Sequence, residues 1–171
     1  MQLVRSIALS GIVTVWAAWL CATPLVGQDG TSSTSRFLAA LTYRAGSFIC
    51  HQQTTRSFHV GGSPLPVCAR CIGLYGGAAA GAWAAVAWML ASRRTRLPRI
   101  SIPLSSVRLS LLVASLPTVI TWAAEQLAHW PGTNAARSVS ALPLGAAVAA
   151  LVVLWAGGAA VDDTPRASEV H

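Results

Sequence analysis

The sequence contains no lysine, and all twelve of its basic residues are arginines, set against five acidic residues for a formal net charge of +7. Charged residues make up only 10% of the chain, compared with about 25% in a typical soluble domain. The arginines are scattered and no nucleic-acid-binding motif accompanies them, which argues against nucleic acid as a partner. A phosphate-binding loop, a Ser–His–Asp arrangement and a nucleotide fingerprint are also missing, so these enzyme classes are not indicated.

The chain is instead rich in long apolar runs. Hydrophobic residues make up 54% of it, and the mean hydropathy is +0.56. Four runs are long enough to cross a bilayer, which takes about 20 apolar residues, and each is apolar on all sides, as contact with lipid requires. A soluble Ala-rich bundle would need more polar surface. The sequence therefore predicts an all-α polytopic membrane protein, with the lipid bilayer as partner and no protein partner indicated. It forms a single membrane domain over 1–171, with spans at about 7–26, 71–91, 109–128 and 139–161.

The positions of the arginines predict the orientation of the chain in the membrane. The segment SRRTRLPR at 92–99 places four arginines directly after the second span, and Arg5 precedes the first. Because cytoplasmic flanks are enriched in basic residues, we expect a multi-pass protein of the inner (cytoplasmic) membrane with both termini cytoplasmic. The loop 27–70 then lies outside, and 162–171 forms a cytoplasmic tail. The first span also resembles a cleaved signal peptide, but its length and weak cleavage context favour an uncleaved helix.

The outer loop is predicted to contain a short helix of a different kind. After a polar linker, apolar residues recur at spacings of three, four and three, at Leu38, Leu41, Ala45 and Phe48. This pattern lines one helical face and predicts an amphipathic helix lying on the membrane surface, with Ser35 as its N-cap. The helix would place Cys50 at its C-terminal end, and a Gly- and Pro-rich turn would bring Cys68 back toward it.

Three of the four cysteines and two of the four histidines lie in the 22-residue segment CHQQTTRSFHVGGSPLPVCARC, which spans 50–71. Two residues between Cys68 and Cys71 allow both sulfurs to point at one atom or at each other. Together with Cys50 they supply three soft ligands. The leading hypothesis is therefore an outward-facing Cys/His metal-binding site of the zinc type at the membrane surface.

An imidazole would complete a tetrahedral Cys3His site. His51 is the first candidate, and His59 is the alternative because adjacent residues such as Cys50 and His51 often point apart. The competing interpretation is that the cysteines are small apolar residues beside a membrane helix. We favour that interpretation for Cys21, which lies within the first span.

Thiol redox chemistry is the main alternative function, with Cys68 and Cys71 as the catalytic pair and a quinone as cofactor. A helix N-terminus and Arg70 both favour the thiolate, and an outward loop lies in an oxidising compartment. The arrangement broadly resembles quinone-linked disulfide-generating enzymes. Those enzymes carry a second cysteine pair, whereas this chain has no cysteine after Cys71, so Cys50 would be the lone resolving thiol. A third possibility is a non-enzymatic transporter or complex subunit in which the site only braces the loop.

Three further polar residues are candidates for cofactor binding: Arg56, Glu125 and Arg137. Glu125 shares a helix face with His129 at the outer end of the third span, on the same side as the cysteines. A carboxylate near the membrane is costly unless it is paired, and Arg137 is the expected partner. The two could equally form a structural ion pair, and Arg56 could contact headgroup phosphates.

The string YRAGSFICHQQTTRSFHVGGSPLPVCARCIGLYGG at 43–77 carries a specific pattern of Cys-His-Gln, Arg-Ser-Phe, Cys-Ala-Arg-Cys and Gly-x-Tyr. Together with a looser match over 125–145, it resembles a family of small predicted membrane proteins known only as a domain of unknown function. The resemblance supports the membrane assignment and implies no activity. It implies signature positions at Cys50, His51, Gln52, Arg56, Ser57, Phe58, Cys68, Arg70, Cys71, Gly73, Tyr75 and Gly76.

Overall fold

A computed structural model of the chain describes residues 1–28, 32–94, 101–128 and 130–162. Its elements are, in order, α1 (Gln2–Gln28), α2 (Ser33–Ile49), the 3-10 turn η1 (Thr54–Arg56), β1 (His59–Val60), β2 (Ser63–Pro64), α3 (Ala69–Arg94), β3 (Ser101–Pro103), α4 (Leu104–Leu127), α5 (Asn134–Ala156) and β4 (Ala160–Asp162). Four helices are long and apolar enough to cross a membrane: Gln2–Val26, Ala69–Arg94, Leu104–Leu127 and Asn134–Ala156. The prediction of a helical membrane fold with four spans and one shorter helix is confirmed.

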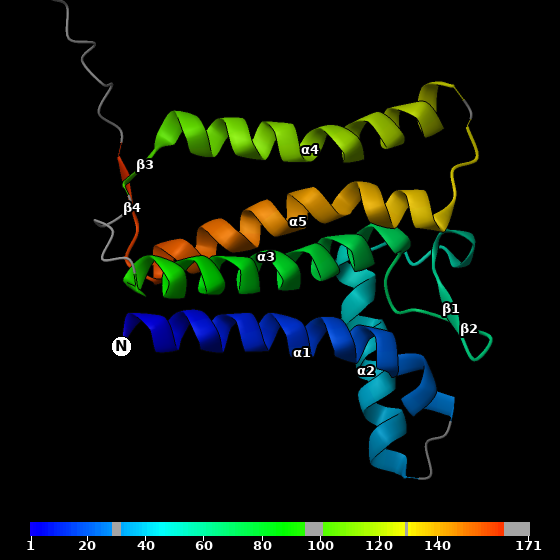
Figure 1. Cartoon of the computed structure of the whole chain (residues 1–171). Helices are drawn as coiled ribbons and strands as arrows, with labels where there is room; N and C mark the ends of the chain where they lie inside the picture. The colour runs from blue at the N-terminus through cyan, green and yellow to red at the C-terminus, as the bar shows by residue number, and fades with distance from the viewer. Residues whose placement is uncertain (29–31, 95–100, 129, 163–171) are drawn as a thin grey trace, which may run out of the picture.

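The four long helices lie side by side, and α2 runs across them at one end of the bundle (Figure 1). The antiparallel β1–β2 hairpin and the connection between α4 and α5 lie at the same end. The N-terminus and the parallel β3–β4 pair lie at the opposite end. The end that holds α2 and the hairpin is called the cysteine end below, because it also holds Cys50, Cys68 and Cys71.

Helices α3 and α5 approach closely because glycines remove side chains from their contact surface. A Cβ atom on Gly73, Gly77 or Gly81 would collide with the backbone of α5, and a Cβ atom on Gly145 of α5 would collide with the Leu74 carbonyl. The three α3 glycines recur every four residues and therefore lie on one helical face. In lipid, where apolar burial drives little association, such close backbone packing supplies the attraction between helices.

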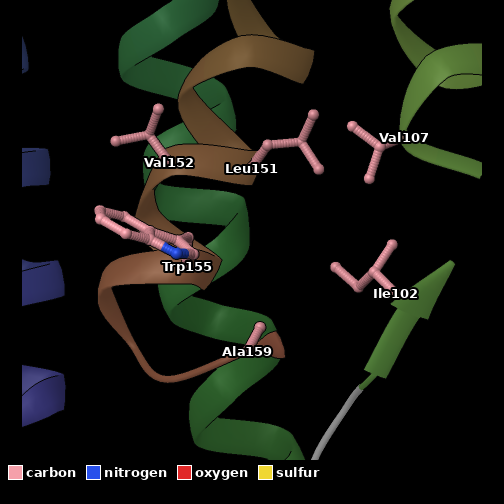
Figure 2. A pocket seen from close by; sticks show the side chains of 6 residues that line it. All are labelled: Ile102, Val107, Leu151, Val152, Trp155 and Ala159. Carbon is pink, nitrogen blue, oxygen red and sulfur yellow. The ribbon is translucent and has the colours of Figure 1, made fainter. Parts of the chain in front are cut away.

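Helix α4 packs on α5 and leaves most of its surface free. None of its residues from 104 to 127 is buried, although the Thr118 hydroxyl donates to the Ser140 carbonyl of α5 at 2.8 Å. Between the two helices, at the end opposite the cysteines, a cleft of about 210 Å³ is lined by Ile102, Val107, Leu151, Val152, Trp155 and Ala159 (Figure 2). All six side chains are apolar, so this cleft offers no group for chemistry.

Helix α2 buries small residues and exposes large ones. Ala39, Thr42 and Gly46 face the protein, and the Trp19 indole donates to the Thr42 hydroxyl at 2.9 Å, which fixes α2 on α1. The residues of the predicted apolar face are exposed, with Leu38 at 43%, Leu41 at 53% and Phe48 at 81%. A helix on a membrane surface exposes its apolar side in this way, toward lipid.

Several helix ends differ from the predicted boundaries, and two of the differences have a clear physical cause. The fourth span was expected to reach 161, but α5 ends at Ala156, where Gly157 caps the helix and Gly158 adopts a φ of 92°. The residues that follow pair with β3 instead. Ser35 lies inside α2, and Ser32 is the N-cap because its hydroxyl accepts from the Ser35 N–H at 3.2 Å.

Candidate functional site

Cys50 ends helix α2 in a position fixed by close backbone contacts. Its backbone is extended, and its N–H donates to the Gly46 carbonyl at 2.9 Å. A Cβ atom on Gly46 would collide with the carbonyl oxygen of Pro66, so the missing side chain lets α2 lie directly against the segment that leads into α3. Cys50 is only 9% exposed, and its thiol therefore faces the interior of the fold.

Gln52 ties the end of α2 to the segment before α3. Its φ of 47° is a conformation that costs a non-glycine residue about 1–2 kcal/mol. Its side-chain Nε2 donates to the carbonyls of Tyr43 and Pro66, each at 2.7 Å, and the Tyr43 hydroxyl adds a third link to the Pro64 carbonyl at 2.6 Å. Gln52 was a signature position in the sequence, but nothing there indicated this positioning role.

The three cysteine sulfurs of the loop converge, as the sequence predicted. The Cys68 backbone N–H donates to the Cys50 sulfur at 3.2 Å, and the Cys68 and Cys71 sulfurs are 3.7 Å apart. All three sulfurs lie within 4.8 Å of one another. Apolar residues surround them, notably Leu20 and Val67, so the cluster is shielded on one side by the bundle.

The electrostatic environment favours the thiolate form of Cys68. A hydrogen bond from the Cys71 thiol is the largest contribution, and it lowers the pKa of Cys68 to about 5 against the opposing effect of burial. The Cys71 backbone N–H and the Cys50 thiol also lower this pKa. At neutral pH Cys68 therefore carries a negative charge that can bind a cation or attack an electrophile.

Neither predicted histidine joins the sulfur cluster. His51 lines the cavity beside it, but it is not part of the group of ligand atoms that lie within 4.8 Å of one another. His59 is exposed in β1 and pairs with Pro64 in the hairpin. Within the described ranges the candidate ligand group consists of three cysteines alone. His129 lies outside the described residues, and Cys21 is exposed on α1 and is not part of the group.

A cavity of about 440 Å³ opens beside the sulfurs. Its lining combines thiols, guanidinium groups, amides and two large apolar side chains, contributed by Ile49, Cys50, His51, Gln52, Gln53, Arg56, Cys68, Arg70, Cys71, Trp122 and Arg137. Two of the predicted cofactor-binding residues, Arg56 and Arg137, therefore face the same space as the cysteines. A small molecule in this cavity would contact both the thiols and the arginines.

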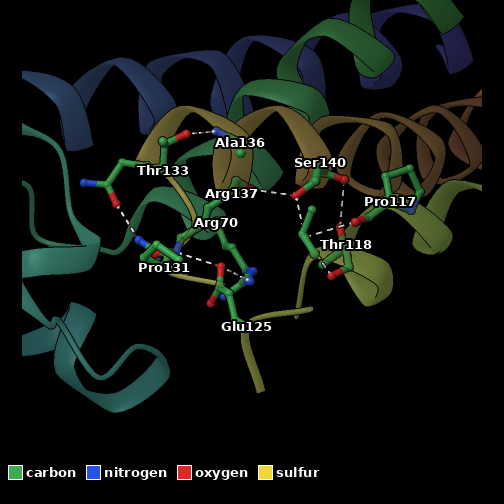
Figure 3. Close-up of polar contacts among 11 residues, drawn as sticks. Arg70, Pro117, Thr118, Glu125, Pro131, Thr133, Ala136, Arg137 and Ser140 are labelled. Carbon is green, nitrogen blue, oxygen red and sulfur yellow. Dashed lines mark hydrogen bonds and ion pairs between the residues drawn. The ribbon is translucent and has the colours of Figure 1, made fainter. Parts of the chain in front are cut away.

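Glu125 joins the third and fourth spans to the cysteine segment. Its Oε1 accepts from Arg137 Nε at 2.9 Å and from Arg70 Nη2 at 2.8 Å, while its side chain is only 3% exposed (Figure 3). The predicted Glu125–Arg137 pair is present. Its extension to Arg70 was not predicted, because the two residues are 55 positions apart and only the fold brings them together.

All three nitrogens of the Arg137 guanidinium group donate hydrogen bonds to protein acceptors. Besides Glu125, it donates from Nη1 to Asn134 Oδ1 at 2.9 Å and from Nη2 to the Pro131 carbonyl at 2.8 Å. Asn134 in turn donates to the Ser57 carbonyl at 3.0 Å. This chain of bonds fixes the α4–α5 connection against the loop that carries the cysteines.

The Arg70–Glu125 pair makes one hydrogen bond where a bidentate pair would make two. Arg70 Nε and Glu125 Oε2 are both buried and have no partner among the described residues. Arg70 is the residue between Cys68 and Cys71 in sequence, so this ion pair anchors the start of α3 directly at the cysteines.

The chain belongs to the family of predicted membrane proteins described as DUF2085, whose profile matches residues 50–151. Over 51 residues it is 43% identical to the uncharacterised protein MJ1492 of Methanocaldococcus jannaschii, a segment that covers 30% of this chain and 33% of that protein. The chain thus aligns with only about a third of the length of this relative. No solved structure matches it.

Proposed function

We propose that this member of the family binds a zinc-type metal ion through the thiolates of Cys50, Cys68 and Cys71, at the outer face of the inner membrane. The observation that carries the proposal is the convergence of three sulfurs within 4.8 Å, from residues as far apart as 50 and 71. Thiolates are the ligands that zinc and other soft metals prefer.

The spacing of the sulfurs supports metal binding. Two sulfurs bound at about 2.3 Å to a tetrahedral ion lie about 3.8 Å apart, and the Cys68 and Cys71 sulfurs are 3.7 Å apart. The backbone N–H that donates to the Cys50 sulfur is the kind of outer contact that orients a metal ligand. The three sulfurs could therefore receive an ion with small movements.

The fourth coordination position is proposed to face the cavity. All three cysteines line that cavity, and His51 is the nearest imidazole along the chain. Three protein ligands with one open position are typical of catalytic zinc sites, whereas a fourth protein ligand is typical of structural sites. An exogenous ligand, or His51 after a local rearrangement of the loop, would occupy the fourth position.

The proposed orientation places the site outside the cytoplasm. Arg5 lies near the N-terminus, and Arg93 and Arg94 end α3 at the same end of the bundle (Figure 1). Because basic residues favour the cytoplasmic side, the cysteine end would face outward. Accessibility of Cys50, Cys68 and Cys71 to a membrane-impermeant thiol reagent in intact, chelator-treated cells tests this orientation, and labelling only after lysis would contradict it.

The metal content of the purified protein tests the proposed ligands. The full chain, purified in detergent under reducing conditions and supplied with zinc, is expected to retain about one zinc per chain. Each of Cys50→Ser, Cys68→Ser and Cys71→Ser is expected to lose it, whereas Cys21→Ser, the matched control at an exposed cysteine outside the group, should retain it. Equal zinc content in Cys21→Ser and the three other variants would contradict the proposal.

A thiol–disulfide oxidoreductase is the second candidate, favoured by the 3.7 Å separation of the Cys68 and Cys71 sulfurs. In this reaction the two thiols lose two protons and two electrons as the sulfur–sulfur bond forms, and a quinone takes up both to become a quinol. Purification without reductant would then yield a metal-free chain with a Cys68–Cys71 disulfide, and added quinone would reoxidise the reduced protein. Absence of both results would rule this candidate out.

A further inference from the structure

The cavity beside the cysteines has an arginine wall that the proposed metal ligands do not use. Arg56, Arg70 and Arg137 line it, and Glu125 is the carboxylate that pairs with two of them. In the sequence, Glu125 is the sole acidic residue between Asp29 and Asp162. Three guanidinium groups against one carboxylate give this wall a net positive charge, which attracts anions.

Two of the three arginines have guanidinium N–H groups that remain available to bind a ligand. Arg137 is fully engaged, because Nε, Nη1 and Nη2 all have protein acceptors. Arg70 uses only Nη2, on Glu125, and the Arg56 guanidinium has no acceptor within the described parts of the chain. Arg137 therefore contributes charge, while Arg56 and Arg70 can also donate hydrogen bonds into the cavity.

The same cavity has an apolar side that reaches the surface. Ile49 and Trp122 line it, and they are 62% and 54% exposed. Trp122 lies five residues from the C-terminal end of the third span, Leu104–Leu127, a depth at which tryptophans meet lipid headgroups. Ile49 continues the exposed apolar surface of α2 that includes Phe48. A soluble anion would gain nothing from these two side chains, but an amphipathic one would.

We propose that this cavity binds the phosphate headgroup of a membrane lipid, with Arg56 and Arg70 donating to the phosphate oxygens. The planar guanidinium fork fits phosphate in a way that a point charge does not. Ile49 and Trp122 contact the apolar part of the same molecule. This inference goes beyond the metal site and does not require a bound ion.

Binding of a short-chain lipid to the full chain in detergent tests the inference. The probe is dioctanoyl phosphatidic acid, compared with dioctanoylglycerol, which lacks the phosphate, and with glycerol 3-phosphate, which lacks the acyl chains. Saturable binding of the phosphatidic acid alone is expected. Arg56→Gln should weaken it by about tenfold or more, since hydrogen bonds to charged groups contribute strongly.

Arg44→Gln is the matched control, because Arg44 is an exposed arginine of α2 that does not line the cavity. It should change the affinity by less than about twofold, as expected for a screened surface charge. The variant Arg70→Gln removes the second donor, while Glu125 keeps its ion pair with Arg137, so no buried carboxylate is left unpaired, and it should also weaken binding.

Three results would overturn the inference. They are equal loss of affinity in Arg44→Gln and Arg56→Gln, equal binding of dioctanoylglycerol, or equal binding of glycerol 3-phosphate, which would assign the site to soluble phosphates. Zinc is measured in every sample. The contrast between Arg56→Gln and Arg44→Gln decides the lipid inference, and zinc content decides the metal proposal, so the two can fail separately.

Discussion

The two ends of the bundle each contain a cavity, and the two cavities differ in composition. At the cysteine end the lining holds three thiols and three guanidinium groups, whereas at the opposite end all six lining side chains are apolar. Both lie beside helices of the same membrane-spanning type. The difference arises from the connections, because the segment between α2 and α3 supplies most of the polar groups at the cysteine end.

This contrast shows how a small membrane protein can combine a lipid-compatible body with one end that gathers thiols and guanidinium groups. The apolar cleft needs no specific partner for any of its side chains. At the cysteine end each polar group that is buried needs one, and Gln52, Glu125 and Arg137 make the bonds that hold the loop in place. Single substitutions should therefore have large effects at the cysteine end and small effects at the other.

The largest effect is expected for Glu125→Ala. It leaves the Arg70 and Arg137 guanidinium groups close together without their carboxylate, and removing one partner of a buried ion pair costs about 3–5 kcal/mol of unfolding free energy. Val152→Ala, in the apolar cleft and 49% exposed, should cost less than about 1 kcal/mol. Thermal unfolding in detergent measures both, and similar unfolding temperatures would show that the two ends do not differ.

Gly77→Ala, at the α3–α5 contact that lies between the two ends of the bundle, should have the next largest effect on stability. Its Cβ would collide with the Leu142 backbone, and overpacking costs about 1–3 kcal/mol, here toward the upper value because backbone cannot move aside easily. Gly76→Ala is the control, since its Cβ would meet only the Leu142 side chain at 3.7 Å. A destabilisation by Gly76→Ala as large as that by Gly77→Ala would argue against the close α3–α5 contact.

Gln52→Ala should destabilise the protein by a smaller amount, about 1–2 kcal/mol, because the Tyr43 and Pro66 carbonyls lose their donor. It should also weaken zinc binding, since the end of α2 is no longer held against the segment before α3. Gln53→Ala is its neighbour and matched control, a lining residue whose side chain makes no hydrogen bond within the described residues. Equal zinc affinity in the two variants would show that Gln52 does not position the cysteines.

The smallest effect concerns reactivity rather than stability. In zinc-free, reduced protein, the rate of Cys68 alkylation should change little between pH 8 and pH 6 and fall by half near the pKa of about 5, because the thiolate is the reacting form. A free cysteine peptide, with a pKa near 8.5, should slow about tenfold for each pH unit over the same range. A parallel decline of the two rates would show that Cys71 does not stabilise the Cys68 thiolate.

The sequence predicted the features that depend on residue type and local spacing. Four apolar runs predicted the four helices that are long and apolar enough to span a membrane. The spacing of Cys68 and Cys71, together with the Gly- and Pro-rich turn, predicted that their sulfurs lie close to that of Cys50. The charges of Glu125 and Arg137 on facing helix ends were enough to predict their pairing. In each case one local pattern contained the physical cause.

The remaining features depend on tertiary contacts that no local pattern contains. Arg70 reaches Glu125 only because the start of α3 and the end of α4 lie at the same end of the bundle, and Gln52 acts through a backbone conformation with positive φ. His51 was predicted from its residue type, which does not decide whether the ring reaches the sulfurs, and His51 lies outside the sulfur group. Helix α5 ends earlier than predicted, because Gly157 and Gly158 terminate it although the residues that follow them are still apolar.

X-ray absorption at the zinc edge of the purified, zinc-supplied full chain is the most direct test of the proposed metal centre. A zinc ion bound by Cys50, Cys68 and Cys71 should show three sulfur neighbours at about 2.3 Å and one nitrogen or oxygen neighbour at about 2.0–2.2 Å. A spectrum with fewer than three sulfur neighbours, or a chain that retains no zinc, would contradict it.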